Sequence, residues 1–262
     1  DRLFQWVFGN EGGKDLLLSL LNAVLRNKGF TPVVSLSYKD PRFSGEILDY
    51  KTSTLDIAVV DEDGKSYDIE MQIKSHSAYN ERALYYWAAL YRSQDIKGKT
   101  YKELKPAIGI LFLDYSTCEE SPWHWYVSLR PDYALDKLFS HHLYMHFLEM
   151  PKLLNKLQSP HFLDESDSLE AWIYALHNIQ IEGDPTMTDL ITKNENFENL
   201  KKRYAEFVQS PDNALRLIFQ EKFELDRNTE IQDNIERGRE EGRKEGLEQG
   251  LEQGLEQGLE QG

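Results

Sequence analysis

The segment from residue 55 to residue 74 constrains the fold of this chain more than any other part of the sequence. Residues 55–60 form a β-branched apolar run, and residues 66–74 form a run that alternates between apolar and polar side chains. The Asp- and Gly-rich residues 61–65 join the two runs. Two such runs with such a connection predict a β-hairpin.

The alternation predicts which side chains of the hairpin share a face. Successive side chains of a strand point to opposite faces, so one face of the second strand is expected to enter the core and the other to be polar. The polar face carries Asp68, Glu70, Gln72 and Lys74. In the first strand, Asp56 falls on the same polar side.

The length of the connection sets the register of the hairpin. A connection over residues 61–65 pairs Val60 with Ser66 and therefore Asp56 with Glu70. Directly opposed residues have Cβ atoms about 4.5–5.5 Å apart, and two carboxylates this close repel each other unless a cation lies between them. An acidic residue on a strand is usually only solvated. The pairing with Glu70 inside an apolar run instead favours a divalent metal site.

A hairpin with Asp on its first strand and Glu-x-Lys on its second resembles the core of the PD-(D/E)XK nuclease superfamily. Segments 55–57 (Leu-Asp-Ile) and 69–72 (Ile-Glu-Met-Gln) are similar to the Rpn family of recombination-promoting nucleases, also described as YhgA-like putative transposases. In that family Gln replaces the superfamily's Lys, and Gln72 stands at this position. Segments 1–9, 81–87 and 98–104 extend the resemblance, although the family usually has Lys where Gln5 stands here.

The resemblance implies a Mg²⁺-dependent DNA endonuclease with the metal held by Asp56, Glu70 and the backbone carbonyl of Met71. Gln72 would position the attacking water as the third catalytic residue. Magnesium suits hard oxygen ligands of this kind. A catalytically silent nuclease fold that binds nucleic acid, or an oligomeric interaction protein, is the alternative interpretation.

Three further residues are expected to support the site. Asp1 matches the family's leading acidic residue and either approaches the metal or caps the first helix. Lys74 lies on the polar face beyond Gln72 and would partly replace the missing lysine. Arg82 lies one helix later, where a guanidinium could hold a phosphate or the carboxylates.

The resemblance also implies an α/β fold with a PD-(D/E)XK restriction-endonuclease-like core, in which helices flank a central mixed sheet. We expect the nuclease-like domain over residues 1–150, a helical region over 151–235 and a repeat tail over 236–262. The tail repeats Leu-Glu-Gln-Gly, with glycine at every fourth position, so it is a weak helix by itself. Disorder and homo-oligomerisation through the tail or the C-terminal region both remain open.

The remaining elements follow from periodicity. Helices are expected over 1–25, with a break at Gly12-Gly13, over 79–96 and in several stretches after residue 169. Tyr85 and Tyr86 are expected to pack on the buried face of the second of these helices. Strands are expected over 33–38, 107–113, 123–129 and 143–150, and the uninterrupted apolar run at 107–113 predicts a strand buried on both faces.

Composition limits the partners and the compartment. The net charge of −15 is concentrated in the second half: residues 1–130 carry 18 acidic and 16 basic side chains, and residues 131–262 carry 27 and 14. The nearly balanced first half permits a local phosphate-binding surface. The single Cys118 excludes an intrachain disulfide and a cysteine-based zinc site, and no apolar run approaches a membrane span. We expect a bacterial cytoplasmic protein without a membrane partner.

A histidine metal site is disfavoured. His142 and His146 are four residues apart, close to His141, but no third ligand is evident and residues 143–150 alternate like a strand.

Overall fold

The computed structural model describes residues 2–40, 55–75, 78–94, 98, 100–157 and 168–211, together with residues 239 and 243. The expectations for Asp1 and for most of the repeat tail lie outside these residues. By its internal contacts the chain divides into two compact units, residues 1–207 and 208–262.

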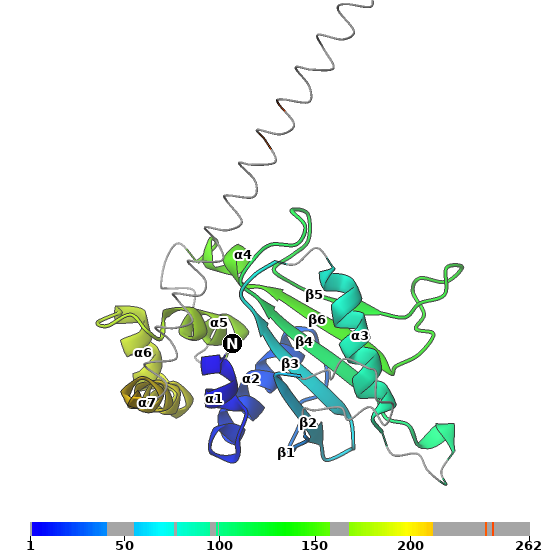
Figure 1. The fold of residues 1–262 in the computed structure, drawn as a ribbon, viewed down its shortest axis with the longest axis horizontal. Coiled ribbons are helices and arrows are strands. Elements are labelled where there is room, and N and C mark those ends of the chain that lie inside the picture. The colour runs from blue at the N-terminus through cyan, green and yellow to red at the C-terminus, as the bar shows by residue number, and fades with distance from the viewer. Residues whose placement is uncertain are drawn as a thin grey trace, which may run out of the picture. The chain divides into compact units, whose positions relative to one another are not determined.

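The core of the first unit is a mixed six-stranded sheet in the order β1-β2-β3-β4-β6-β5 (Figure 1). Strands β3, β4 and β6 run parallel to one another, and the other pairings are antiparallel. Helices cover both faces of the sheet. The strands are β1 (Leu36–Tyr38), β2 (Ile57–Asp61), β3 (Ser66–Gln72), β4 (Ala107–Leu113), β5 (His124–Ser128) and β6 (Leu143–Glu149).

The predicted hairpin is formed by β2 and β3. Val60 pairs with Ser66 and Ile57 pairs with Ile69, so the predicted register is confirmed. Its turn is held by Asp61, whose side chain accepts hydrogen bonds from the backbone N–H groups of Asp63 (3.0 Å) and Lys65 (2.8 Å). Both segments therefore enter the sheet in the alignment that the sequence predicts.

One face of the sheet packs on α1 (Arg2–Phe8), α2 (Lys14–Asn27) and the C-terminal helices. A short 3₁₀ turn, Glu11–Gly13, separates α1 from α2 at the predicted break. A side chain at Gly13 would collide with the carbonyl oxygen of Val7, so this tight connection requires glycine. The helical prediction for the first segment is confirmed.

The opposite face, which was expected to be polar, is covered by α3 (Tyr79–Arg92) (Figure 1). Tyr79, Ala83 and Leu90 of α3 are buried against the strands. Tyr85 is 51% exposed, so its predicted packing is wrong. Because α3 closes this face, the acidic side chains of β3 lie in the protein interior.

The C-terminal helices of the described chain belong to the same compact unit as the sheet. Trp172 and Phe197 are fully buried, with their rings 5.0 Å apart, and Trp172 also contacts Phe8 of α1. The expected boundaries at residues 150 and 235 remain predictions. Among the described helices, none is long and apolar enough to cross a membrane. These helices are α4 (Met150–Leu154), α5 (Leu169–Asn178), α6 (Pro185–Lys193) and α7 (Glu195–Gln209).

Candidate nuclease site

Asp56 lies one residue before β2 and is held by groups from two other elements. Its Oδ1 accepts a hydrogen bond from Gln5 Nε2 of α1 (2.7 Å), and its Oδ2 accepts one from the backbone N–H of Met71 in β3 (3.2 Å). Continuing the hairpin register by one step beyond the Ile57–Ile69 pair places Asp56 opposite Glu70. The contact with Gln5 had no signal in the sequence.

Glu70 is buried on the face that α3 covers, with 3% of its surface exposed. Its Oε2 accepts a hydrogen bond from Gln72 Nε2 (3.0 Å). Burial and then the negative charge of Asp56 raise the pKa of Glu70 to about 7, although the charge of Arg82 and the Gln72 hydrogen bond oppose the shift. A carboxyl group in this state takes up a proton or a cation readily near neutral pH.

Asp68 is a third carboxylate on the same face, and its importance was missed in the sequence. It is 4% exposed, and its Oδ1 has no hydrogen-bond partner among the described residues. Burial, followed by the charges of Glu70 and Asp56, raises its pKa well above the ordinary value. Its sheet neighbours are the small residues Ala58 and Gly109. The alternation of β3 placed Asp68 beside Glu70, but it did not indicate burial.

The other predicted site residues differ in how they interact with Glu70 and Asp68. Gln72 ends β3 and contacts Glu70, whereas Lys74 follows two residues later and is exposed. Arg82 is exposed on α3, with its guanidinium carbon 5.2 Å from the centre of the Tyr86 ring. Its positive charge lowers the pKa of both Glu70 and Asp68, so Arg82 acts electrostatically on the carboxylates.

Glu149 is another buried carboxylate near this face, but its environment is different. It accepts hydrogen bonds from Thr117, Ser121 and Trp125 and forms an ion pair with Lys152 (2.9 Å). These contacts outweigh the effect of burial and lower the pKa of Glu149 to about 2. The carboxylate oxygens of Glu149 are therefore satisfied by several protein donors. Among the described residues, Glu70 has one such hydrogen bond, from Gln72, and Asp68 Oδ1 has none.

Comparison with known proteins identifies the family of the chain. The family described as PD-(D/E)XK nuclease family transposase matches the chain over residues 1–234. The chain belongs to this family. No curated protein and no solved structure matches it. The Rpn and YhgA-like resemblance is thereby confirmed, and the six-stranded mixed sheet flanked by helices fits the core of a PD-(D/E)XK nuclease.

The donor atoms of the transposase-family hairpin are of the type that Mg²⁺ prefers. Asp56 and Glu70 offer carboxylate oxygens, and Met71 between Glu70 and Gln72 offers a main-chain carbonyl. Among the described residues, no group of three or more His, Cys, Asp or Glu side chains has an arrangement that could hold a metal ion. A pair of carboxylates with one carbonyl suits Mg²⁺, since this ion keeps several waters.

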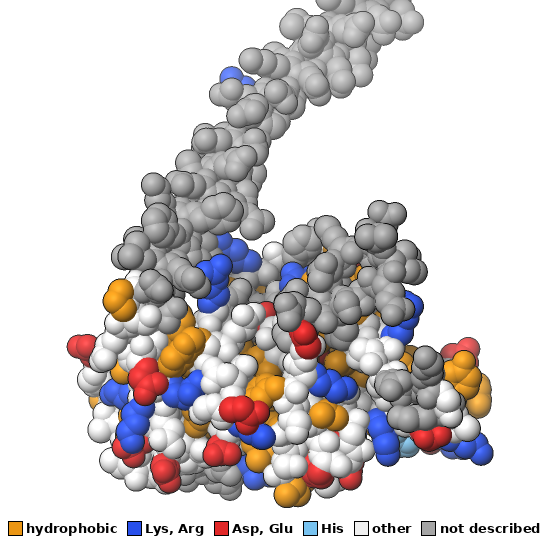
Figure 2. Space-filling view, turned by 60° about the horizontal axis from the view of Figure 1, so that its bottom comes forward, with side chains coloured by type: hydrophobic (Ala, Val, Ile, Leu, Met, Phe, Trp, Pro, Cys, Tyr) orange, Lys and Arg blue, Asp and Glu red, His pale blue; other side chains and the backbone are white. Residues whose placement is uncertain are grey.

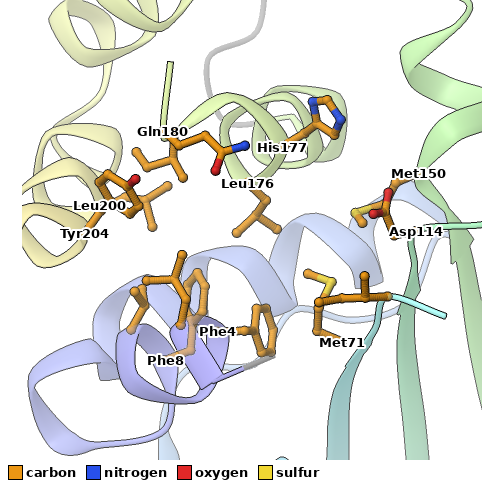
Figure 3. A pocket seen from close by; sticks show the side chains of 14 residues that line it. Phe4, Phe8, Met71, Asp114, Met150, Leu176, His177, Gln180, Leu200 and Tyr204 are labelled. Carbon is orange, nitrogen blue, oxygen red and sulfur yellow. The ribbon is translucent and has the colours of Figure 1, made fainter. Parts of the chain in front are cut away.

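A cavity of about 290 Å³ adjoins the other face of β3 (Figure 3). Met71 and Ile73 line it together with Phe4 and Phe8 of α1. Residues 71 and 73 alternate with Glu70 and Gln72, so the cavity lies on the opposite side of the strand from the carboxylates. It is a mainly apolar space between the sheet and the helices, and it does not contain the candidate nuclease site.

The histidines do not form the metal site that their spacing invites. His142 Nδ1 lies 2.9 Å from the hydroxyl of Tyr91, and His141 Nδ1 lies 3.1 Å from that of Tyr144. His146 is fully buried on the other side of the sheet, 3.1 Å from His124.

The described surface carries charges of both signs. On the face shown in Figure 2, Lys and Arg side chains are interspersed with Asp and Glu side chains rather than gathered into a continuous basic surface. The net charge of −15 adds a general repulsion of polyanions.

Proposed function

We propose that the chain is a divalent-metal-dependent DNA endonuclease that hydrolyses phosphodiester bonds with Mg²⁺ as its cofactor. The observation that carries the proposal is that the hairpin ladder ends at the Ile57–Ile69 pair, directly beside Asp56 and Glu70, and that the charge of Asp56 acts on Glu70. The charge of Asp56 contributes to raising the pKa of the buried Glu70 to about 7, which makes the pair unfavourable without a counter-charge. Membership of the PD-(D/E)XK nuclease transposase family supports the nuclease chemistry.

Asp56, Glu70 and the Met71 carbonyl would hold the cation. A divalent cation bound there would supply Lewis-acid stabilisation of the negative charge that develops on the phosphate. The fixed hydrogen bonds of Asp56 to Gln5 and Met71 orient one ligand before the cation arrives. Such orientation by surrounding groups raises metal affinity in other metal sites.

Gln72 and Arg82 would act on the substrate side. The Gln72 amide is a neutral donor and acceptor that can position a water molecule beside the scissile phosphate. The exposed guanidinium of Arg82 can bind phosphate oxygens through paired N–H groups, and it already acts electrostatically on Glu70. Arg82 would then supply part of the positive charge that Gln72 does not provide. Lys74 and Asp1 keep their roles only as predictions.

A catalytically silent nuclease fold is the second candidate, because glutamine stands where the superfamily has lysine. In that case the chain would bind nucleic acid or assemble through its C-terminal region without cleaving DNA. The bacterial cytoplasmic location and homo-oligomerisation also remain predictions.

Cleavage of supercoiled plasmid DNA tests the proposal. The wild type is assayed with Mg²⁺ beside Asp56→Asn, Glu70→Gln and the control Asp63→Asn, which alters an exposed carboxylate in the turn of the same hairpin. We expect both site variants to lose at least about 100-fold in rate, because they remove charge from the cation site. EDTA should stop the wild type, and Asp63→Asn should cleave normally. Cleavage by Glu70→Gln at the wild-type rate would refute the assignment.

A further inference from the structure

Gln5 connects the first helix of the chain to the hairpin. Its amide Nε2 lies 2.7 Å from Asp56 Oδ1, although the two residues are 51 positions apart in the sequence. The other carboxylate oxygen of Asp56 accepts from the Met71 backbone at 3.2 Å. One side-chain amide and one backbone amide thus determine the orientation of the Asp56 carboxylate.

Helix α1 is itself held firmly, so it can serve as a rigid support for Gln5. Phe4 and Phe8, which flank Gln5 in α1, are buried in the core. The Arg203 side chain of α7 donates to the carbonyls of Trp6 (2.8 Å) and Val7 (2.9 Å) and lies over the Trp6 ring. Gln5 is therefore presented from a fixed backbone, which lowers the entropy lost in orienting Asp56.

Gln5 and Gln72 each donate a hydrogen bond to one carboxylate of the site. Gln5 donates to Asp56 at 2.7 Å, and Gln72 donates to Glu70 at 3.0 Å. An amide donor carries no net charge, so both contacts orient a carboxylate without neutralising it. Both contacts therefore leave the charge of the carboxylate available to a cation.

We propose that Gln5 is a positioning residue of the metal site, which holds Asp56 in its metal-binding orientation through a neutral hydrogen bond from α1. The inference rests on the proposed function, since it assumes that Asp56 binds the cation. It adds a residue from outside the hairpin and gives the N-terminal helix a part in metal binding.

The test measures Mn²⁺ binding to the full chain, without DNA, from the electron paramagnetic resonance signal of free Mn²⁺. Gln5→Met keeps the length of the side chain and removes the donor. Gln94→Met is the matched control, because Gln94 is a partly buried glutamine whose amide bonds the backbone of Lys105 (2.8 Å) away from the carboxylates. Asp56→Asn shows whether the measured site is the proposed one, and thermal unfolding of each variant reports its fold.

We expect Gln5→Met to weaken Mn²⁺ binding about tenfold, as removal of groups that orient metal ligands does elsewhere. Gln94→Met should bind Mn²⁺ like the wild type even if it melts at a lower temperature. Wild-type affinity in Gln5→Met, with weakened binding in Asp56→Asn, would overturn the role of Gln5 and leave the proposed function intact. Unchanged affinity in Asp56→Asn would overturn both.

Discussion

Gln72 donates a hydrogen bond to Glu70 on the same face of β3, with 3.0 Å between Gln72 Nε2 and Glu70 Oε2. Gln72 was expected to position water, and its amide donates a hydrogen bond to the Glu70 carboxylate. The contact lowers the pKa of Glu70 against the larger effect of burial. Gln72 thus helps keep Glu70 available for a cation.

Replacing Gln72 by the superfamily's lysine tests whether the site lacks a positive charge at this position. In Gln72→Lys, an ammonium group would lie beside Glu70 and near the scissile phosphate, where it stabilises developing negative charge. We expect the rate of plasmid cleavage with saturating Mg²⁺ to rise about tenfold. Gln94→Lys adds the same charge away from the site and should leave the rate unchanged. An equal or slower rate in Gln72→Lys would contradict the idea that a positive charge is missing here.

The affinity for metal should depend on pH through Glu70. Its pKa is raised to about 7 in the folded chain, so below this pH a proton occupies the carboxylate and must leave before a cation binds. We expect the Mn²⁺ affinity to fall by about tenfold per pH unit as the pH drops below 7, and to level off above about 8. Calorimetric titration at four pH values between 5.5 and 8.5 measures this. A flat profile through pH 7 would contradict the assignment of Glu70 as a ligand.

The buried histidine pair predicts a loss of stability in acid. Burial lowers the pKa of His124 to about 3 and of His146 to about 4, and His124 is further affected by His146. The unfolded chain binds protons at these residues from about pH 6.5 downward, whereas the folded chain does not. Stability is therefore complete above pH 6.5 and should fall by on the order of 2 kcal/mol per histidine by pH 4.5.

Urea unfolding at several pH values measures this loss. His146→Gln should reduce the slope between pH 6.5 and 4.5, whereas the exposed His177→Gln should leave it unchanged. An unaltered slope in His146→Gln would show that other groups cause the acid sensitivity.

Two buried aspartates of the hairpin should respond in opposite ways to the same substitution. Asp61 accepts hydrogen bonds from Tyr67 and from the turn backbone, so Asp61→Asn should destabilise the chain by about 1–3 kcal/mol. Asp68 has an oxygen without a hydrogen-bond partner in the described part of the chain, so Asp68→Asn should be neutral or stabilising in the absence of metal. Both are compared by urea unfolding at pH 8 with EDTA. Equal destabilisation by the two substitutions would contradict this distinction.

The parts of the fold that depend on local pattern were predictable from the sequence. The length of the turn and the alternation of β3 fixed the pairing of Val60 with Ser66, and the apolar run at 107–113 became the fully buried β4. The break at Gly12-Gly13 was also predicted. Each of these features follows from residues that are close in the sequence.

What the sequence left open depends on contacts between distant segments. Alternation assigned Asp68 and Glu70 to a polar face, but only the packing of α3 determines that this face is buried. The contact of Gln5 with Asp56 and that of His124 with His146 join separate elements. Neither of these contacts leaves a periodic signal, so the structure was needed to find them.

A crystal of the full chain soaked in Mn²⁺ tests the central claim most directly, through an anomalous difference map recorded at the manganese absorption edge. The account predicts a peak bonded by carboxylate oxygens of Asp56 and Glu70 and by the carbonyl oxygen of Met71, and no such peak in Glu70→Gln. Manganese bound elsewhere, with nothing between Asp56 and Glu70, would contradict the assignment of this pair as the metal site of the nuclease.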